Sequence, residues 1–245
     1  FPHIAVHNLH HNASAAAEMA VTLMLAASKS IVPADRALRR HDWRPRYDPY
    51  PTIVLHGKTV LILGWGAIGR RVDQACRGLG MDVIAVRRRP PEDAARQLYP
   101  PAALPRLLPR ADVLIIALPL TEETEGLIGE KELDLLSPGA VLVNVGRGPV
   151  VQEAALYRAL QQRRLRAAGL DVWYNYPPDR VSRARTPPSA YPFHQLDNVV
   201  LSPHRAGSGG SEEIELRRMD RLARLVNAAA AGRQIPNRVD LQLGY

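Results

Sequence analysis

Short apolar runs recur through most of the chain, and segments with helical spacing separate them. The runs occupy residues 59–63, 82–86, 113–118, 140–144, 167–172 and 199–201, and helical patterns stand between most of them, notably at 130–136 and 152–163. Because the runs are almost wholly apolar, they are typical of strands that are covered on both faces. Such strands in alternation with helices predict an α/β fold built on a doubly wound parallel sheet.

Two further helices and two irregular segments are expected outside the sheet. A helix is expected over residues 21–31, after an Ala-rich stretch in which Asn12 or Ser14 could cap it. Its apolar circumference indicates burial against another domain or another subunit. A final amphipathic helix is expected over residues 211–231, and the Pro- and Arg-rich segments 42–53 and 174–195 are expected to be irregular.

Composition and charge limit the number of domains and argue against a membrane or nucleic-acid partner. The 245 residues allow one large domain or two modest ones, and no apolar run approaches the roughly 20 residues that cross a bilayer. The net charge of +8 comes from scattered arginines without interleaved aromatic residues, so neither a nucleic-acid nor a membrane partner is expected. The one cysteine, Cys76, excludes an internal disulfide, fits a cytoplasmic protein and is expected to be a buried filler.

A glycine-rich turn follows the run at 59–63 and opens a helix that is expected to reach about Leu79. The turn reads GWGAIG at residues 64–69. In such a turn Gly64 makes the tight bend, Gly66 lets the backbone approach a pyrophosphate, and Gly69 lets helix and strand pack closely. The pyrophosphate then lies on the helix N-terminus, where free N–H groups favour an anion. This order of elements predicts a Rossmann-type dinucleotide site.

The end of the second run indicates which dinucleotide binds. About 20 residues after a glycine motif of this kind, an Asp or Glu is expected to hold the ribose 2′-hydroxyl of NAD. Here Arg87, Arg88 and Arg89 occupy that place. A guanidinium pairs with a 2′-phosphate, whereas a carboxylate repels it. NADP(H) is therefore the expected cofactor, and NAD(H) is the alternative if these arginines point into solvent.

Several segments beyond the glycine turn occur in a recognisable order. They read PLTEETEGLI at 119–128, GAVLVNVGRG at 139–148, EAAL at 153–156, GLDV at 169–172 and SPH at 202–204. In this order they resemble the D-isomer-specific 2-hydroxyacid dehydrogenases. That family includes glyoxylate/hydroxypyruvate reductases, phosphoglycerate, formate and phosphite dehydrogenases, and the C-terminal-binding-protein corepressors. The resemblance runs from about His7 to Asn237.

The resemblance implies roles for individual residues. Arg147 would hold the substrate carboxylate and polarise its carbonyl, and His204 would donate a proton to the substrate oxygen. Asp171 would contact the nicotinamide side of the cofactor. With the glycine turn and the arginines, the expected cofactor-binding set is Gly64, Gly66, Ala67, Ile68, Gly69, Arg87, Arg88, Leu118, Pro119, Thr124, Val145, Gly146, Arg147, Asp171, His204 and Ala206.

One departure from the family concerns the partner of the histidine. The family usually places a Glu, which hydrogen-bonds the catalytic His, where this chain has Tyr176. A tyrosine hydroxyl can orient an imidazole, but it stabilises imidazolium less than a carboxylate does. Tyr176 is therefore the third expected catalytic residue. Asp179 or Asp197 could replace the Glu if the segment 174–195 folds back.

A second departure concerns the N-terminal lobe, which in the family supplies much of the substrate pocket and closes over the cofactor. Residues 1–12 are expected to be the end of that lobe and the crossover. Residues 13–205 are the expected dinucleotide-binding domain with an N-terminal dimerisation helix, and residues 206–245 are a helix and tail that return toward the lobe. Because the chain begins with Phe1, it is expected to be cut, processed or a short form.

These features predict an oxidoreductase that transfers a hydride between NADP(H) and a small 2-hydroxy or 2-oxo acid, as a glyoxylate/hydroxypyruvate reductase does. The missing Glu and lobe are expected to lower its activity. The alternative is a non-catalytic dinucleotide-binding sensor or corepressor-like module. A homodimer through residues 19–31 is expected. His7, His10 and His11 have a spacing that could clamp a metal, but no Cys or carboxylate is near, so no metal is expected.

Overall fold

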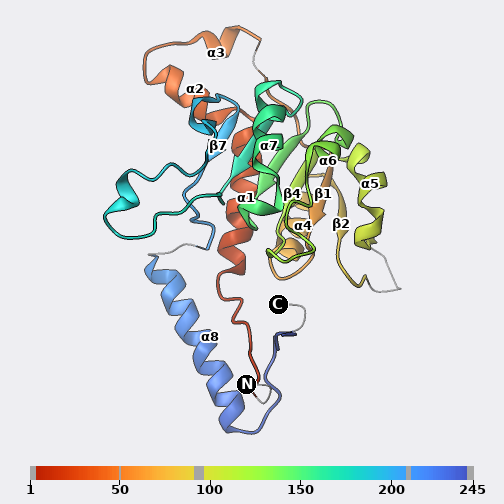
Figure 1. The fold of residues 1–245 in the computed structure, drawn as a ribbon, viewed down its shortest axis with the longest axis vertical. Helices are drawn as coiled ribbons and strands as arrows, with labels where there is room; N and C mark the ends of the chain where they lie inside the picture. Colours follow the sequence, from red (N-terminus) through yellow and green to blue (C-terminus); the bar gives the residue numbers. More distant parts are fainter. Residues whose placement is uncertain (1–3, 50, 91–96, 208–210, 242–245) are drawn as a thin grey trace.

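A parallel sheet of seven strands organises this computed structural model, which describes residues 4–49, 51–90, 97–207 and 211–241 (Figure 1). The strand order is β3-β2-β1-β4-β5-β6-β7, and each neighbouring pair is parallel. The predicted α/β, Rossmann-type fold is confirmed. The strands are β1 (Thr59–Leu63), β2 (Asp82–Val86), β3 (Gln97–Tyr99), β4 (Val113–Ile116), β5 (Val141–Asn144), β6 (Ala167–Leu170) and β7 (Val199–Leu201).

The predicted strands are confirmed in order, with differences at their ends and at one sheet edge. The runs at 59–63, 82–86 and 199–201 coincide with β1, β2 and β7. The runs at 113–118 and 167–172 extend past β4 and β6, because residues such as Val172 are buried in the loops that follow the strands. The pattern does not predict β3, since Leu98 is the one buried residue in that short edge strand.

Helices cover both faces of the sheet (Figure 1). Each face of the sheet has its own hydrophobic core, and alternate residues of β1 pack into one core or the other. Val60 and Ile62 pack with residues of α1 (Ala13–Ser28) and α4 (Gly69–Gly78). Leu61 and Leu63 pack in the core on the other face. That core includes residues of α5 (Leu104–Leu107), α6 (Glu130–Leu135) and α7 (Glu153–Gln161). The helices predicted at 130–136 and 152–163 are confirmed as α6 and α7.

The apolar helix α1 is buried by its own sheet. It contacts β5, β6, β7 and α4, and Met24 is fully buried. The approach to β6 is so close that a Cβ on Gly169 would lie 2.7 Å from the Cβ of Leu23. The helix begins at Ala13, earlier than predicted, and neither predicted cap acts, because Asn12 takes the N-cap position without a side-chain hydrogen bond. The sheet and α4 therefore bury one side of this apolar helix.

Among the described residues, no single helix is long and apolar enough to cross a bilayer. α1 and α2 (Ile31–Leu38) reach the required length and composition only together, across a bend of 63°. The segment 42–53, predicted to be irregular, contains the short helix α3 (Arg44–Tyr47), whose first turn holds a proline.

The last helix, α8 (Glu212–Ala230), extends away from the sheet (Figure 1). Ile214 is the one buried residue within it. The chain then returns along its own beginning, where the Val239 N–H donates to the Val6 carbonyl at 2.8 Å and His7 forms an antiparallel bridge with Arg238. The boundaries predicted at residues 12 and 205 stay predictions, and residues 1–3 and 242–245 lie outside the described part.

Candidate functional site

The loops at one edge of the sheet carry the residues of the predicted site. Because the strands are parallel, their carboxyl ends meet at that edge. The strand order reverses between β1 and β4, and ligands of doubly wound sheets bind at such a point, outside the carboxyl ends. The loops after β1, β2, β4, β5, β6 and β7 carry Gly64, Arg87, Leu118, Arg147, Asp171 and His204.

The glycine turn between β1 and α4 has the predicted geometry. Gly64 has φ +95°, and a Cβ there would lie 2.6 Å from the Ala117 carbonyl oxygen. A Cβ on Gly69 would lie 2.0 Å from the Gly64 carbonyl oxygen, so only glycine allows the helix to start this close to the turn. Gly66 faces open space, with nothing within 4 Å of its Cβ position. The turn thus leaves room for a phosphate at the N-terminus of α4.

A pocket of ≈ 290 Å³ lies beside this turn. Its lining consists of Gly64, Trp65, Gly66, Arg87, Arg88, Arg89, Ala117, Leu118 and Pro119. The predicted arginines at the end of β2 therefore face the same space as the glycine turn. A larger hollow of ≈ 400 Å³ lies between residues 4–6 and 238–241, but no expected catalytic or cofactor-binding residue lines it.

Trp65 is a pocket residue that the sequence pattern does not single out. The guanidinium of Arg87 lies 5.9 Å from the centroid of its ring, and that of Arg70 lies 5.8 Å from it. Guanidinium groups at such distances are attracted to the face of an indole ring. The indole therefore helps to hold Arg87 at the pocket. The sequence does not single out Trp65, because the glycine motif allows any residue at that position.

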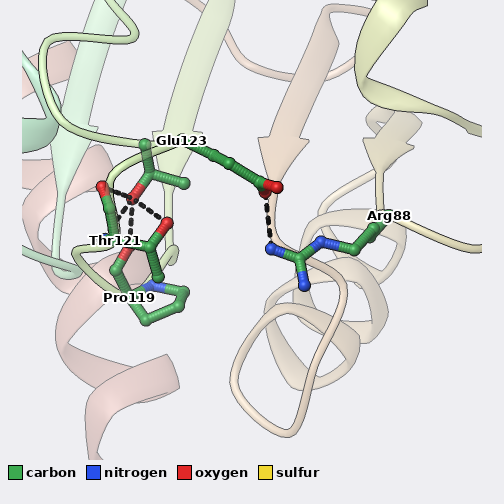
Figure 2. Close-up of polar contacts among 5 residues, drawn as sticks. Arg88, Pro119, Thr121 and Glu123 are labelled. Atoms are coloured by element: carbon green, nitrogen blue, oxygen red, sulfur yellow. Dashed lines mark hydrogen bonds and ion pairs between the residues drawn. The ribbon is translucent and has the colours of Figure 1, made fainter. Parts of the chain in front are cut away.

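The loop after β4, whose Pro119, Thr121 and Glu123 are labelled in Figure 2, is closed by hydrogen bonds of Thr124. Its hydroxyl donates to the Pro119 carbonyl at 2.7 Å and accepts from the Thr121 N–H at 2.8 Å. The same loop carries Glu123, whose carboxylate forms an ion pair with Arg88 at 2.6 Å. Thr124 was expected to bind the cofactor, and the structure gives it this structural role. No sequence pattern singles out Glu123, since it is an acidic residue in an exposed turn.

The loop after β5 is held by the buried side chain of Asn144. Its amide donates to the Arg147 carbonyl at 3.0 Å, and its oxygen accepts from the Gly146 N–H at 3.0 Å. Val145 is buried and donates its N–H to the Ile116 carbonyl. Arg147 itself is exposed, and its guanidinium donates to the Gly146 carbonyl at 2.7 Å. The guanidinium is thus available at the edge where β5 ends.

The buried carboxylate of Asp171 organises the loop that carries His204. It accepts from the N–H groups of Arg205 and Ala206, both at 2.8 Å, and from the Ser202 hydroxyl. His204 has φ +55°, in the left-handed region, where a non-glycine residue is strained. The three bonds to Asp171 hold the loop in this conformation. Asp171, expected at the nicotinamide, therefore has a structural role at this edge of the sheet.

His204 is exposed and contacts the ring of Tyr176, with 5.5 Å between the ring centroids. The Tyr176 hydroxyl accepts from the Trp173 N–H at 3.1 Å. The hydroxyl was expected to orient the imidazole, but the described residues show no hydrogen bond between the two groups. Asp197 pairs with Arg163 at 2.6 Å, and Asp179 accepts from the Ser182 N–H at 2.8 Å, so neither takes the place of the family's Glu.

The structure also describes the surroundings of the histidines near the N-terminus and of Cys76. The His7 ring lies 2.8 Å from the Pro236 carbonyl oxygen. Burial, and then the positive charges of Arg70 and Arg71, lower the pKa of His10. Within the described ranges, no three His, Cys, Asp or Glu side chains are grouped so that they could hold a metal ion. Cys76 is buried, as predicted, and burial raises the pKa of its thiol to about 12.

Asp171→Asn should loosen the loop at residues 202–206, because the new amide group turns a donor toward backbone N–H donors. We expect unfolding in urea to show a loss of about 1–3 kcal/mol, the range for a buried hydrogen-bonding group left unsatisfied. Asp179→Asn is the control, since this exposed carboxylate caps a turn in another loop, and a smaller loss is expected. Equal losses in the two variants would contradict the role given to Asp171.

Comparison with known proteins agrees with this geometry. The sequence profile for the D-isomer specific 2-hydroxyacid dehydrogenase, NAD binding domain, matches residues 21–206. A glyoxylate reductase of Korarchaeum cryptofilum is 35% identical over 235 residues, which cover 93% of this chain and 66% of the relative. A D-3-phosphoglycerate dehydrogenase of Mycobacterium tuberculosis is 37% identical over 231 residues, which cover 94% of this chain and 41% of the relative.

Solved structures give the same result. A D-isomer specific 2-hydroxyacid dehydrogenase from Xanthobacter autotrophicus Py2, in complex with NADPH and MES, is 28% identical with a TM-score of 0.80, and the match covers 100% of this chain and 95% of that one. An acyclic imino acid reductase in complex with NADPH and D-Arg is 28% identical with a TM-score of 0.82, covering 98% and 72%. The chain spans 35–67% of the length of the curated relatives it matches. The chain belongs to the D-isomer specific 2-hydroxyacid dehydrogenase family and contains its NAD-binding domain.

Proposed function

We propose that the chain is an NADP(H)-dependent oxidoreductase that interconverts a small 2-oxo acid and the corresponding 2-hydroxy acid. Glyoxylate and hydroxypyruvate are the first substrates to test, since glyoxylate reductases are among the relatives. The observation that carries the proposal is the placement of Arg147 and His204 on loops at the same sheet edge as the glycine turn. A cation and a proton donor at that edge are what the reduction of a 2-oxo acid requires.

The pocket fits a dinucleotide with a phosphate on its ribose. The open space at Gly66 and the N-terminus of α4 suit the pyrophosphate, and three arginines suit a 2′-phosphate. Two similar solved structures contain NADPH, which supports the preference for NADP(H) over NAD(H). When bound, the nicotinamide supplies or accepts the hydride.

The chain's own residues would bind the substrate and transfer the proton. The exposed Arg147 guanidinium would leave the Gly146 carbonyl and pair with the substrate carboxylate. The His204 imidazolium would donate its proton to the substrate oxygen as the carbonyl is reduced. The strained backbone at His204 supports this role, because strained residues cluster at functional sites. Tyr176 would restrict the imidazole by ring contact.

A non-catalytic dinucleotide sensor is the second candidate. It is favoured by the surroundings of the His204 ring. The Tyr176 hydroxyl accepts from the backbone N–H of Trp173 instead, and no described carboxylate or hydroxyl is hydrogen-bonded to the ring. An enzyme needs His204 for turnover, whereas a sensor needs only the pocket. Turnover assays should include acyclic imines, because one similar structure is an imino acid reductase.

The first test of catalysis is the pH dependence of 2-oxo acid reduction. The protonated imidazole is the proton donor in this proposal, so the rate should fall toward alkaline pH. Tyr176→Glu should move this falling limb to higher pH, since a carboxylate beside the ring favours imidazolium. Tyr176→Phe should change the rate modestly, and His204→Ala should lower it by ~10²–10⁴-fold. Unchanged turnover in His204→Ala would overturn the assignment and leave the sensor.

Cofactor preference is tested by equilibrium binding. NADPH should bind more tightly than NADH, and Arg87→Asp should remove most of the difference, because a carboxylate would then face the 2′-phosphate. Loss of one charged hydrogen-bonded contact should cost on the order of 1.5–3 kcal/mol of NADPH binding, with a small effect on NADH. Equal affinities of the unaltered protein for the two dinucleotides would refute the preference.

We also propose that the chain forms a homodimer through the outer face of α1. Met19, Val21 and Leu25 lie at the margin of the core under α1 and are only partly buried, so each has apolar surface left for a second chain. Sedimentation equilibrium at micromolar concentration should give the mass of two chains, and Val21→Arg should lower it toward that of one. A monomeric mass for the unaltered protein would contradict the proposal.

A further inference from the structure

An acidic side chain from one loop is paired with an arginine of the cofactor pocket on another loop. Arg88 follows β2 and lines the pocket, and its Nη2 lies 2.6 Å from a carboxylate oxygen of Glu123 in the loop after β4. The Arg88 side chain is 26% exposed and the Glu123 side chain 70%. Figure 2 shows the pair joining the two loops. A negative charge therefore lies at the group that would receive a 2′-phosphate.

Hydrogen bonds fix the turn that carries Glu123. Glu123 lies between Thr121 and Thr124, and the Thr124 N–H donates to the Thr121 carbonyl at 3.0 Å. The Glu125 N–H donates to the same carbonyl at 2.9 Å, and the Thr124 hydroxyl ties the turn to Pro119. The turn is thus closed on both sides of Glu123. Its carboxylate therefore extends to Arg88 from a fixed stretch of backbone.

We propose that Glu123 is a specificity-determining residue, which limits the preference of the pocket for NADP(H) over NAD(H). This inference rests on the dinucleotide site of the proposed function. A 2′-phosphate must share Arg88 with the carboxylate and is repelled by it. The 2′-hydroxyl of NAD(H) is neutral and can donate to a carboxylate, as it does to the acidic residue that usually follows the second strand. Here that carboxylate comes from the loop after β4.

Glu123→Gln tests the inference by removing the charge and keeping the shape. NADPH should bind roughly two- to fivefold more tightly, the range expected for a half-exposed ion pair, and NADH should bind no more tightly than before. Dissociation constants can be measured by calorimetry or by the fluorescence of the reduced nicotinamide. Adenosine 2′,5′-bisphosphate and 5′-AMP repeat the comparison without a nicotinamide, and the gain should appear only for the bisphosphate.

Two controls separate this effect from a general change of charge. Glu122→Gln removes the same charge from the exposed neighbouring residue and should leave the ratio of NADPH to NADH affinity unchanged. In an Arg88→Gln background, Glu123→Gln should bring a smaller gain, because the competition for that guanidinium is then absent and only the repulsion between the carboxylate and the 2′-phosphate remains.

The possible results test the role of Glu123 and the existence of the dinucleotide site separately. If Glu123→Gln leaves the affinity ratio unchanged, or Glu122→Gln raises it equally, the role of Glu123 is refuted while the dinucleotide site stands. A gain of undiminished size in the Arg88→Gln background would also refute it. If the unaltered protein binds neither NADPH nor NADH, the proposed function fails, and the role of Glu123 fails with it.

Discussion

Parallel pairing of the strands is the constraint on which the rest of the structure depends. Neighbouring strands of a sheet lie about 4.8 Å apart, so loops that leave parallel neighbours emerge side by side. The registers Leu63 with Ile116 and Asn144 with Leu170 bring together the loops after β1 and β4 and those after β5 and β6. Residues far apart in the sequence therefore share one edge. The cores on both faces, including α1 pressed against Gly169, keep the sheet in that arrangement.

Polar side chains then hold the individual loops at this edge. Asn144 fixes the turn that leads to Arg147, Thr124 closes the turn that carries Glu123, and Asp171 braces the strained backbone of His204. In each loop a side chain satisfies backbone groups that no strand or helix can satisfy. Precise loops on a rigid sheet are what a site needs if it is to bind a ligand in one orientation.

The sequence predicts much of this arrangement because its strongest signals are local. The runs at 59–63 and 82–86 are continuous and apolar, and the glycine turn between them has fixed spacing, so β1, α4 and β2 are predictable. β3 has no such run. The partner of a side chain depends on tertiary contacts, which spacing does not encode. The Arg88–Glu123 pair and the contact of Trp65 with Arg87 could therefore not be predicted, and the same holds for the bond from Trp173 to the Tyr176 hydroxyl.

The proposed function depends on the binding of NADP(H) at the carboxyl edge of the sheet. Backbone amide hydrogen exchange with and without saturating NADPH tests it most directly. Exchange should slow in residues 64–69 and 202–206, which lie at that edge. It should stay unchanged in the turn at residues 137–139, which precedes β5 at the opposite edge. Unchanged exchange at 64–69, or protection confined to the opposite edge, would contradict the claim.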